Sequence, residues 1–323
     1  MAATGITIFR IAGGKVAESW TSIDLSASEE ELRWLTEGGG WPGSGDIPSP
    51  EQDLAPSIWD ALTQNLTWRL RVAKDRERER IEQELQVARR IQRASLPKKV
   101  PELEGWEIAP YYRPAREVSG DFYDFHFLSD DRVGLVVGDA TGKGVPAALV
   151  MATTSGMLRA VSQALISSSP SEVLTQVNEA LCSNIAPNMF VTCFYAILDP
   201  ETGHLTYANA GHNLPCCRHE SLEMELRARG MPLGLMPGMS YEEKEMNVAL
   251  GDNVLFYSDG LVEAHDPGGE MFGTPRLRKL LAAYPTDAES LNSMLLKELE
   301  RFTEEGWEQE DDITLLTLRR SVA

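Results

Sequence analysis

The stretch that decides the fold is VGLVVGDATGKGVPAALVMA, residues 133–152. Its first half is a run of small and apolar residues, which predicts a buried strand that ends on Asp139. Its second half is a glycine-rich turn followed by an apolar run, which predicts a helix beginning near Val145. Asp is depleted in strands and an uncompensated buried charge is costly, so an aspartate at this point needs a chemical reason.

The same pattern recurs in three further segments, each with an aspartate at the rim of an apolar strand. They are VSGDFYD with Asp121, LFYSDGLVEA with Asp259, and EQEDDITLLTL with Asp311 and Asp312. Any single one of these could be a turn or cap residue. Together they favour a site for hard divalent cations, which prefer oxygen ligands and, in pairs, activate water for attack on phosphate.

Around these segments, strands and helices each come in groups from about residue 97 to the C-terminus. Helix-like runs cover roughly residues 145–168, 171–186, 274–283 and 288–302, and strand-like runs lie between them in pairs. This is not the strict alternation of a doubly wound parallel sheet. It predicts an α+β fold for residues 97–323, an antiparallel β-sandwich flanked by α-helices.

Two other zones precede this domain. Residues 1–56 contain two alternating runs around a Gly-Gly pair, which predict a β-hairpin, then a short acidic helix near 28–36 and a flexible Gly/Pro-rich linker. The segment FRIAGGKVAESWTSID resembles the last hairpin of SnoaL-like folds. Residues 57–96 predict a helix, interpreted either as a solvated linker or as a dimerising coiled coil; we favour the coiled coil.

Composition excludes several classes of function. The 323 residues are 42% hydrophobic with a formal net charge of -19, which argues against nucleic-acid binding and against docking on anionic lipid. The four cysteines form no CxxC pair, so we expect neither a zinc site nor a disulfide framework, and a cytoplasmic location fits. We expect no signal peptide and no membrane span.

An ordered set of segments carries a family resemblance from about residue 89 to the C-terminus. REVSGDFYDF, VGLVVGDATGKGVPAALVMA, TCFYAILDPETGHLTYANAGHNLP, GMPLGL, LFYSDGLVEA and QEDDITLLTLR resemble the SpoIIE/RsbU branch of the metal-dependent (PPM) protein phosphatases. The resemblance implies an αββα sandwich with two Mn²⁺ or Mg²⁺ ions, the first aspartate bridging both. The implied metal ligands are Asp121, Asp139, the carbonyl of Ala140, Asp259 and Asp311.

The resemblance also implies a reaction and its partners. It implies hydrolysis of phosphoserine or phosphothreonine by a two-metal-activated water, acting on a small anti-sigma-factor antagonist in a bacterial partner-switching pathway. An upstream regulatory protein or sensor segment would control a homodimer formed through residues 57–96. Two rivals remain: a non-catalytic phosphoprotein-binding scaffold, and a haloacid-dehalogenase-type hydrolase suggested by YSDG, although Tyr257 stands where that motif needs a second aspartate.

Several polar neighbours of the motifs have open interpretations. Lys143 is expected to face solvent, with attraction of phosphate the less favoured alternative. His212 is expected to be structural, with a general-acid role as the minor alternative. Arg116 could bind phosphate or pair with a surface acid, and both readings carry equal weight. We prefer Asp311 to Asp312 as the ligand because the first acid of the DDxT motif corresponds to the family's ligand.

Overall fold

The chain divides by its contacts into two units, Met1–Ile81 and Glu82–Ala323. The computed structural model describes residues 7–12, 15–21, 56–128, 130–164, 169–219, 222–284, 286–304 and 308–321. The predicted acidic helix near 28–36 and the Gly/Pro-rich linker lie outside these ranges.

The first unit contains the predicted hairpin and most of a long helix. Strands β1 (Thr7–Ala12) and β2 (Lys15–Thr21) pair antiparallel. Helix α2 (Pro56–Ser95) occupies the zone for which the sequence predicts a helix, and its last residues belong to the second unit. It ends two residues before Pro97, as expected because a proline disfavours helical geometry in the residue before it.

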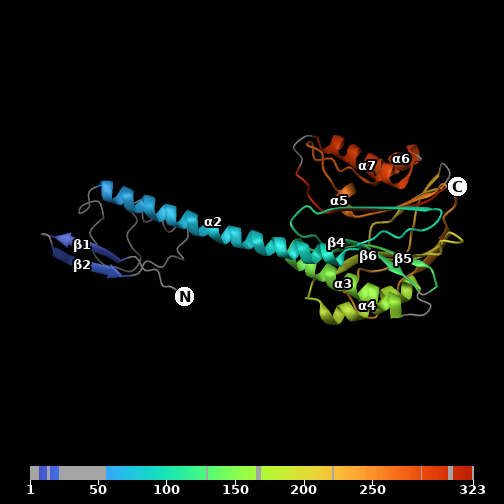
Figure 1. Cartoon of the computed structure of the whole chain (residues 1–323), viewed down its shortest axis with the longest axis horizontal. Coiled ribbons are helices and arrows are strands. Elements are labelled where there is room, and N and C mark those ends of the chain that lie inside the picture. The colour runs from blue at the N-terminus through green and yellow to red at the C-terminus, as the bar shows by residue number, and fades with distance from the viewer. Residues whose placement is uncertain are drawn as a thin grey trace. The chain divides into compact units, whose positions relative to one another are not determined.

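The second unit is a sandwich of two antiparallel sheets, which confirms the predicted architecture (Figure 1). The first sheet has the order β10-β7-β6-β5-β4 and the second the order β3-β12-β11-β8-β9. The strands are β3 (Trp106–Arg113), β4 (Asp121–Phe127), β5 (Val133–Ala140), β6 (Val191–Leu198), β7 (His204–Ala210), β8 (Cys216–His219), β9 (Leu222–Glu225), β10 (Glu243–Asn247), β11 (Asn253–Tyr257) and β12 (Ile313–Arg320).

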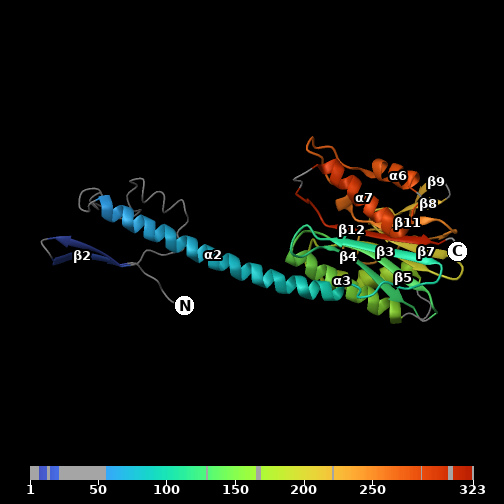
Figure 2. The same cartoon turned by 45° about the horizontal axis from the view of Figure 1, so that its top comes forward.

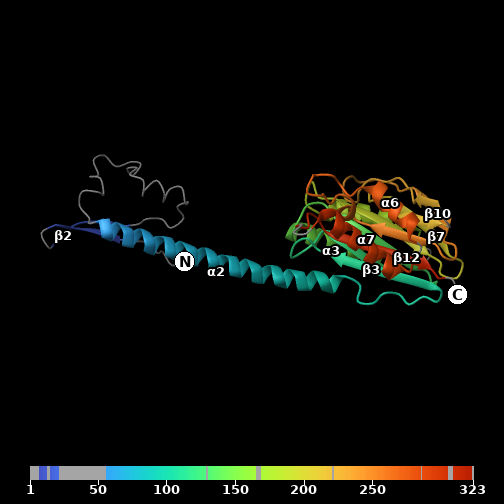
Figure 3. The same cartoon turned by 90° about the horizontal axis from the view of Figure 1, so that it is seen from above.

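Helices cover the outer face of each sheet (Figure 2). The first sheet carries α3 (Val145–Ala164) and α4 (Pro170–Asn184). The second carries α6 (Thr274–Ala283) and α7 (Ala288–Thr303), and Figure 3 shows α7 in front of β3 and β12. The short helix α5 (Asp259–Val262) follows β11 directly.

Both faces of the first sheet are buried, which explains the unbroken apolar run of β5. Val136 packs into the core beneath α3 and α4. Leu135 and Val137 point the other way, into the core between the two sheets, where they meet Phe194 and Phe256. A strand covered on both faces has no polar side, so it reads as continuous apolar sequence.

Helix α3 is long and apolar enough, by length and composition, to pass a test for a membrane span. Its apolar side chains pack inside the domain. Ala147, Met151 and Leu158 are completely buried in the core that α3 shares with the first sheet and α4. We therefore assign α3 as a core helix of this domain.

Candidate metal centre

The hairpin of β4 and β5 places two of the predicted ligands opposite each other. Asp121 opens β4 and pairs directly with Asp139 near the end of β5. Because side chains alternate along a strand, both carboxylates lie on the face that looks toward the second sheet, as Phe125 and Val137 do. Asp121 is only 1% exposed, and its Oδ2 accepts a 2.6 Å hydrogen bond from the Thr314 hydroxyl on β12.

The second sheet brings Asp259 and the 311–312 pair to the same edge. The Ser258 amide donates to the carbonyl of Thr314 at 3.0 Å, and its hydroxyl donates to the carbonyl of Asp312 at 3.2 Å. A Cβ on Gly260 would lie 2.1 Å from that same carbonyl oxygen, so only glycine allows this approach. The start of α5 and the start of β12 are thereby held together, and Asp259 comes to lie beside Asp311.

The electrostatics show that these carboxylates repel one another. Burial, followed by the charge of Asp139, raises the pKa of Asp121 well above its usual value. Burial and the charges of Asp259, Asp311 and Asp312 raise the pKa of Asp139 to about 8. The pKa of Asp259 rises to about 6 through burial and the nearby Asp311. The arrangement gathers negative charge at one spot, which a bound cation would relieve.

Asp311 and Asp312 have different environments although they are adjacent. The carboxylate of Asp312 accepts hydrogen bonds from the Ala115 amide at 2.7 Å, the Ser119 hydroxyl at 2.7 Å and the Gly120 amide at 3.0 Å. It therefore clamps the loop that leads into β4. Asp311 is partly exposed and turns its Oδ2 to Lys143 Nζ, 2.8 Å away. Its Oδ1 accepts a hydrogen bond from the Asp312 amide at 2.9 Å. The choice of Asp311 as the metal ligand stays a prediction.

The carbonyl of Ala140 lies next to the Asp139 carboxylate. A Cβ on Gly120 would meet the Ala140 carbonyl oxygen at 2.6 Å and Asp139 Oδ1 at 2.7 Å. The Ala140 amide also donates to the Gly120 carbonyl at 3.1 Å. The two predicted donors at the end of β5 thus share one small space, and it stays open because residue 120 is glycine.

The donor set fits hard divalent cations. It consists of carboxylate oxygens and one backbone carbonyl, the ligands that Mg²⁺ and Mn²⁺ prefer. Among the described residues, no three acidic, histidine or cysteine side chains are already gathered closely enough to hold an ion. Binding two ions would therefore draw the carboxylates inward, and it would offset the repulsion that raises their pKa values.

The sequence analysis missed the contacts that connect α2 to the site. Gln92, on the last turns of α2, is buried and binds the Ser119 backbone twice, donating to its carbonyl at 2.6 Å and accepting from its amide at 3.1 Å. The Ser119 hydroxyl in turn accepts from the Asp121 amide at 3.0 Å. A glutamine within a highly charged helix reads as solvated, so no local pattern indicates this contact.

The other candidate residues lie around the site with separate roles. His212 is buried, its Nδ1 lies 2.9 Å from the Thr192 hydroxyl, and burial lowers its pKa to about 4. The Asn209 side chain bonds both the amide and the carbonyl of His212, which favours the structural interpretation. Arg116 is exposed in the loop that Asp312 binds, a position that fits phosphate binding and pairing with a surface acid equally. Lys143 does more than face solvent, because it contacts Asp311.

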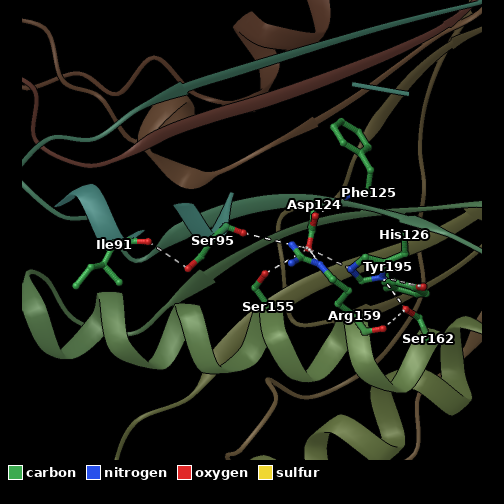
Figure 4. A network of polar contacts seen from close by, with 9 residues as sticks. All are labelled: Ile91, Ser95, Asp124, Phe125, His126, Ser155, Arg159, Ser162 and Tyr195. Carbon is green, nitrogen blue, oxygen red and sulfur yellow. Dashed lines mark hydrogen bonds and ion pairs between the residues drawn. The ribbon is translucent and has the colours of Figure 1, made fainter. Parts of the chain in front are cut away.

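A second buried carboxylate lies three residues along β4 from the metal centre (Figure 4). Asp124 points to the α3 side, where Arg159 donates to its Oδ2 from Nη2 at 2.6 Å and from Nε at 3.1 Å. The Ser155 hydroxyl donates to the same oxygen, and His126 Nε2 lies 3.3 Å away. Arg159 also donates to the carbonyl of Ser95 at the end of α2. This cluster joins α2, α3 and β4.

The haloacid-dehalogenase alternative does not agree with this fold. Every strand pairing among the described residues is antiparallel, and Asp259 begins a short helix between β11 and a loop. A doubly wound parallel sheet, which that alternative requires, is not what the described strands build.

Comparison with known sequences identifies the family. The family described as Stage II sporulation protein E (SpoIIE) matches residues 129–321. The chain is 30% identical to "Phosphoserine phosphatase RsbU" of Bacillus subtilis (strain 168) over 246 residues, 75% of this chain and 71% of RsbU. It is 31% identical to "Protein IcfG" of Synechocystis sp. over 267 residues, 74% of this chain but only 42% of IcfG. The family match does not include the N-terminal hairpin, so the SnoaL-like resemblance is not shown.

Comparison with solved structures gives the same result. The SiaA-PP2C domain of Pseudomonas aeruginosa superposes with a TM-score of 0.67 at 25% identity, covering 75% of this chain and 98% of that domain. The extent of the family match, the identity to RsbU and the shared fold lead to one conclusion: the chain belongs to the SpoIIE family of PP2C-type serine phosphatases and is an RsbU-like member of it.

Proposed function

We propose that the chain is a metal-dependent protein phosphatase that hydrolyses phosphoserine or phosphothreonine esters. The observation that carries the proposal is the pairing of Asp121 with Asp139 at one edge of the sandwich, where Asp259 and Asp311 also lie. The resemblance to the PPM phosphatases implies dependence on divalent ions, and RsbX, which shares the fold at 16% identity, was solved in complex with magnesium. The chemistry of the donors at this edge agrees with that dependence.

The position of each residue indicates its proposed role in binding the two ions. Asp121, deepest and opposite Asp139, would bridge two Mn²⁺ or Mg²⁺ ions; Asp139 and the Ala140 carbonyl would hold one, and Asp259 with Asp311 the other. When bound, such ions orient a phosphate and lower the pKa of water. Thr314 holds the Asp121 carboxylate in place through its hydroxyl. Arg116, in the adjoining loop, would contact a phosphoryl oxygen of the substrate.

We further propose that the substrate is a small phosphorylated anti-sigma-factor antagonist of a partner-switching pathway. The similarity to RsbU, whose name gives it as a phosphoserine phosphatase, supports a phosphoserine substrate. The resemblance to the SpoIIE/RsbU branch implies the antagonist protein that carries it. The chain spans less than half of IcfG and 71% of RsbU, so substrate and partners are inferred from the shared domain.

The test is hydrolysis with a matched pair of variants. We expect the purified full chain to release phosphate from p-nitrophenyl phosphate and from a phosphoserine protein only with Mn²⁺ or Mg²⁺. Asp259→Asn should abolish release. Asp266→Asn should not, because Asp266 lies in a turn where its side chain caps the Glu270 amide. In H₂¹⁸O, the phosphate released should carry one ¹⁸O per turnover.

Two outcomes would contradict the proposal. No hydrolysis with any divalent ion, together with retained binding of a phosphorylated protein, would identify the chain as a non-catalytic scaffold. A covalent beryllofluoride adduct on Asp259 would indicate an aspartyl-phosphate mechanism.

We also propose that α2 regulates the phosphatase activity and that two chains dimerise through it. Gln92 supports the regulatory role, because its two bonds to Ser119 connect the end of α2 to the loop that carries Asp121. Arg89, one turn earlier, pairs with Glu117 at 3.2 Å in the same loop. Displacing the end of α2 would therefore move the loop that enters the metal centre.

A truncation and a glutamine pair test this regulatory step. A chain that starts at Pro97 should turn over more slowly and be monomeric in sedimentation, whereas the full chain should be dimeric. Gln92→Ala should lower turnover and weaken Mn²⁺ binding. Gln86→Ala, on an exposed position of the same helix, should do neither. Unchanged turnover and unchanged association state in the truncated chain would contradict the proposal.

A further inference from the structure

Lys143 stands on an open loop at the mouth of the metal centre. The glycines on both sides, Gly142 and Gly144, have φ values of 93° and 76°, a region that favours glycine. A Cβ on either glycine would find no heavy atom within 4 Å. The backbone around Lys143 is therefore loosely surrounded, and the lysine is the long side chain that this loop carries.

The ammonium group of Lys143 is bound to the acidic cluster itself. Its Nζ lies 2.8 Å from Asp311 Oδ2 and donates to the carbonyl of Glu310, also at 2.8 Å. Its positive charge lowers the pKa of Asp259, against the larger effects that raise it. A cation supplied by the protein thus rests on one of the carboxylates that would hold a metal ion.

We propose that Lys143 is a tethered cation that competes with the divalent ion for Asp311 and, once displaced, binds a phosphoryl oxygen of the substrate. The first step follows from charge, because one carboxylate oxygen cannot hold an ammonium group at 2.8 Å and a divalent ion without strong repulsion between the two cations. The flexible stem of lysine and its two glycine neighbours let the ammonium group leave without moving β12.

The second step rests on the proposed phosphatase function. A phosphate ester is dianionic and brings charge to the edge where Lys143 has lost its partner. Ammonium groups bind phosphate as point charges, without the planar geometry that arginine demands. Lys143 therefore has two opposite effects. It weakens the binding of a divalent ion to the metal-free site, and it strengthens the binding of phosphate once the ion is in place.

The experiment compares Lys143→Met with a matched control, Lys244→Met. Lys244, on β10, makes a similar exposed ion pair, 3.0 Å from Glu242, and removing it changes the net charge by the same amount. Mn²⁺ affinity is measured by calorimetry on the full chain after chelator treatment, a measurement that needs no catalysis. We expect Lys143→Met to bind Mn²⁺ about fivefold more tightly, the scale of one exposed ion pair. Lys244→Met should match the unmodified chain.

Inorganic phosphate tests the second step. With Mn²⁺ saturating, Lys143→Met should bind phosphate about fivefold more weakly, and Lys143→Arg should restore both affinities toward those of the unmodified chain because it keeps the charge. Unchanged or weaker Mn²⁺ binding in Lys143→Met would overturn the competition, and unchanged phosphate binding would overturn the second step. A chain that shows the expected Mn²⁺ pattern yet hydrolyses no phosphoester would refute the proposed function alone.

Discussion

Two aspartates of one strand, Asp121 and Asp124, are both 1% exposed but have opposite electrostatics. Burial alone would raise the pKa of Asp124, yet its contacts with His126 and Arg159 outweigh burial and lower it. The pKa of Asp121 is raised well above its usual value by burial and by Asp139. One carboxylate has its counter-charge built into the protein. The other has no such counter-charge, which supports the proposed role of Asp121 as a metal ligand.

The largest expected effect is the fall in turnover of the Asp121→Asn variant. Removing the carboxylate that faces both predicted ion positions should lower turnover by about 10³-fold or more. In the chelator-treated protein the same change should leave the free energy of unfolding equal or higher, because it removes a repelled charge. Steady-state hydrolysis and urea unfolding measure the two effects. A marked loss of stability in Asp121→Asn without metal would contradict the assignment.

Asp124→Asn should show the reverse pattern. It leaves Arg159 without its carboxylate, and we expect the free energy of unfolding to fall by about 2–3 kcal/mol, less than for a fully buried pair because Arg159 is 41% exposed. Asp130→Asn is the control, since it removes an exposed partner of Arg132 and should cost at most about 1 kcal/mol. Equal losses in the two variants would show that Asp124 is not a structural anchor.

Added metal should distinguish the two aspartates again. Mn²⁺ at about 100 times its dissociation constant should raise the free energy of unfolding of the unmodified chain by about 2.7 kcal/mol. Asp124→Asn should gain a similar amount, whereas Asp121→Asn should lose most of the gain. Urea titrations with and without Mn²⁺ provide the measurement, and an equal gain in both variants would refute the difference between them.

A third buried titratable group, His212, should make the stability of the chain depend on acidic pH. Burial lowers its pKa to about 4 in the folded chain, against about 6.5 when unfolded. Between these values the unfolded chain binds more protons, so stability falls as the pH falls. At pH 5 the loss from this residue should be about 2 kcal/mol relative to neutral pH. His212→Gln should flatten that part of the stability profile; an unchanged slope would contradict the assignment.

The architecture and the gathering of four aspartates at one edge of the sandwich could be predicted from simple patterns. A carboxylate at the end of an apolar strand is conspicuous in β5, and the grouping of strands and helices indicates the sandwich. The different environments of Asp311 and Asp312 could not be read locally, since they depend on the amides of Ala115 and Gly120, nearly two hundred residues away in the chain.

Contacts made by residue types that are usually solvated could not be predicted from the sequence either. Gln92 and Lys143 belong to residue types that are usually solvated. Their partners, Ser119 and Asp311, are set by how α2 and the loop after β5 pack. Sequence patterns report burial and periodicity, so they find residues that violate a pattern and miss those that fit one.

The direct pairing of Asp121 with Asp139 limits where insertions can be tolerated in related chains. At the far end of the hairpin, the Leu128 amide closes the turn by donating to the Arg132 carbonyl. Insertions there would lengthen the turn and leave the register intact. A single residue inserted within β4, between the turn and Asp121, would rotate that carboxylate to the α3 side, where Phe122 is completely buried. Length variation among related chains should therefore concentrate at that turn and avoid the strand itself.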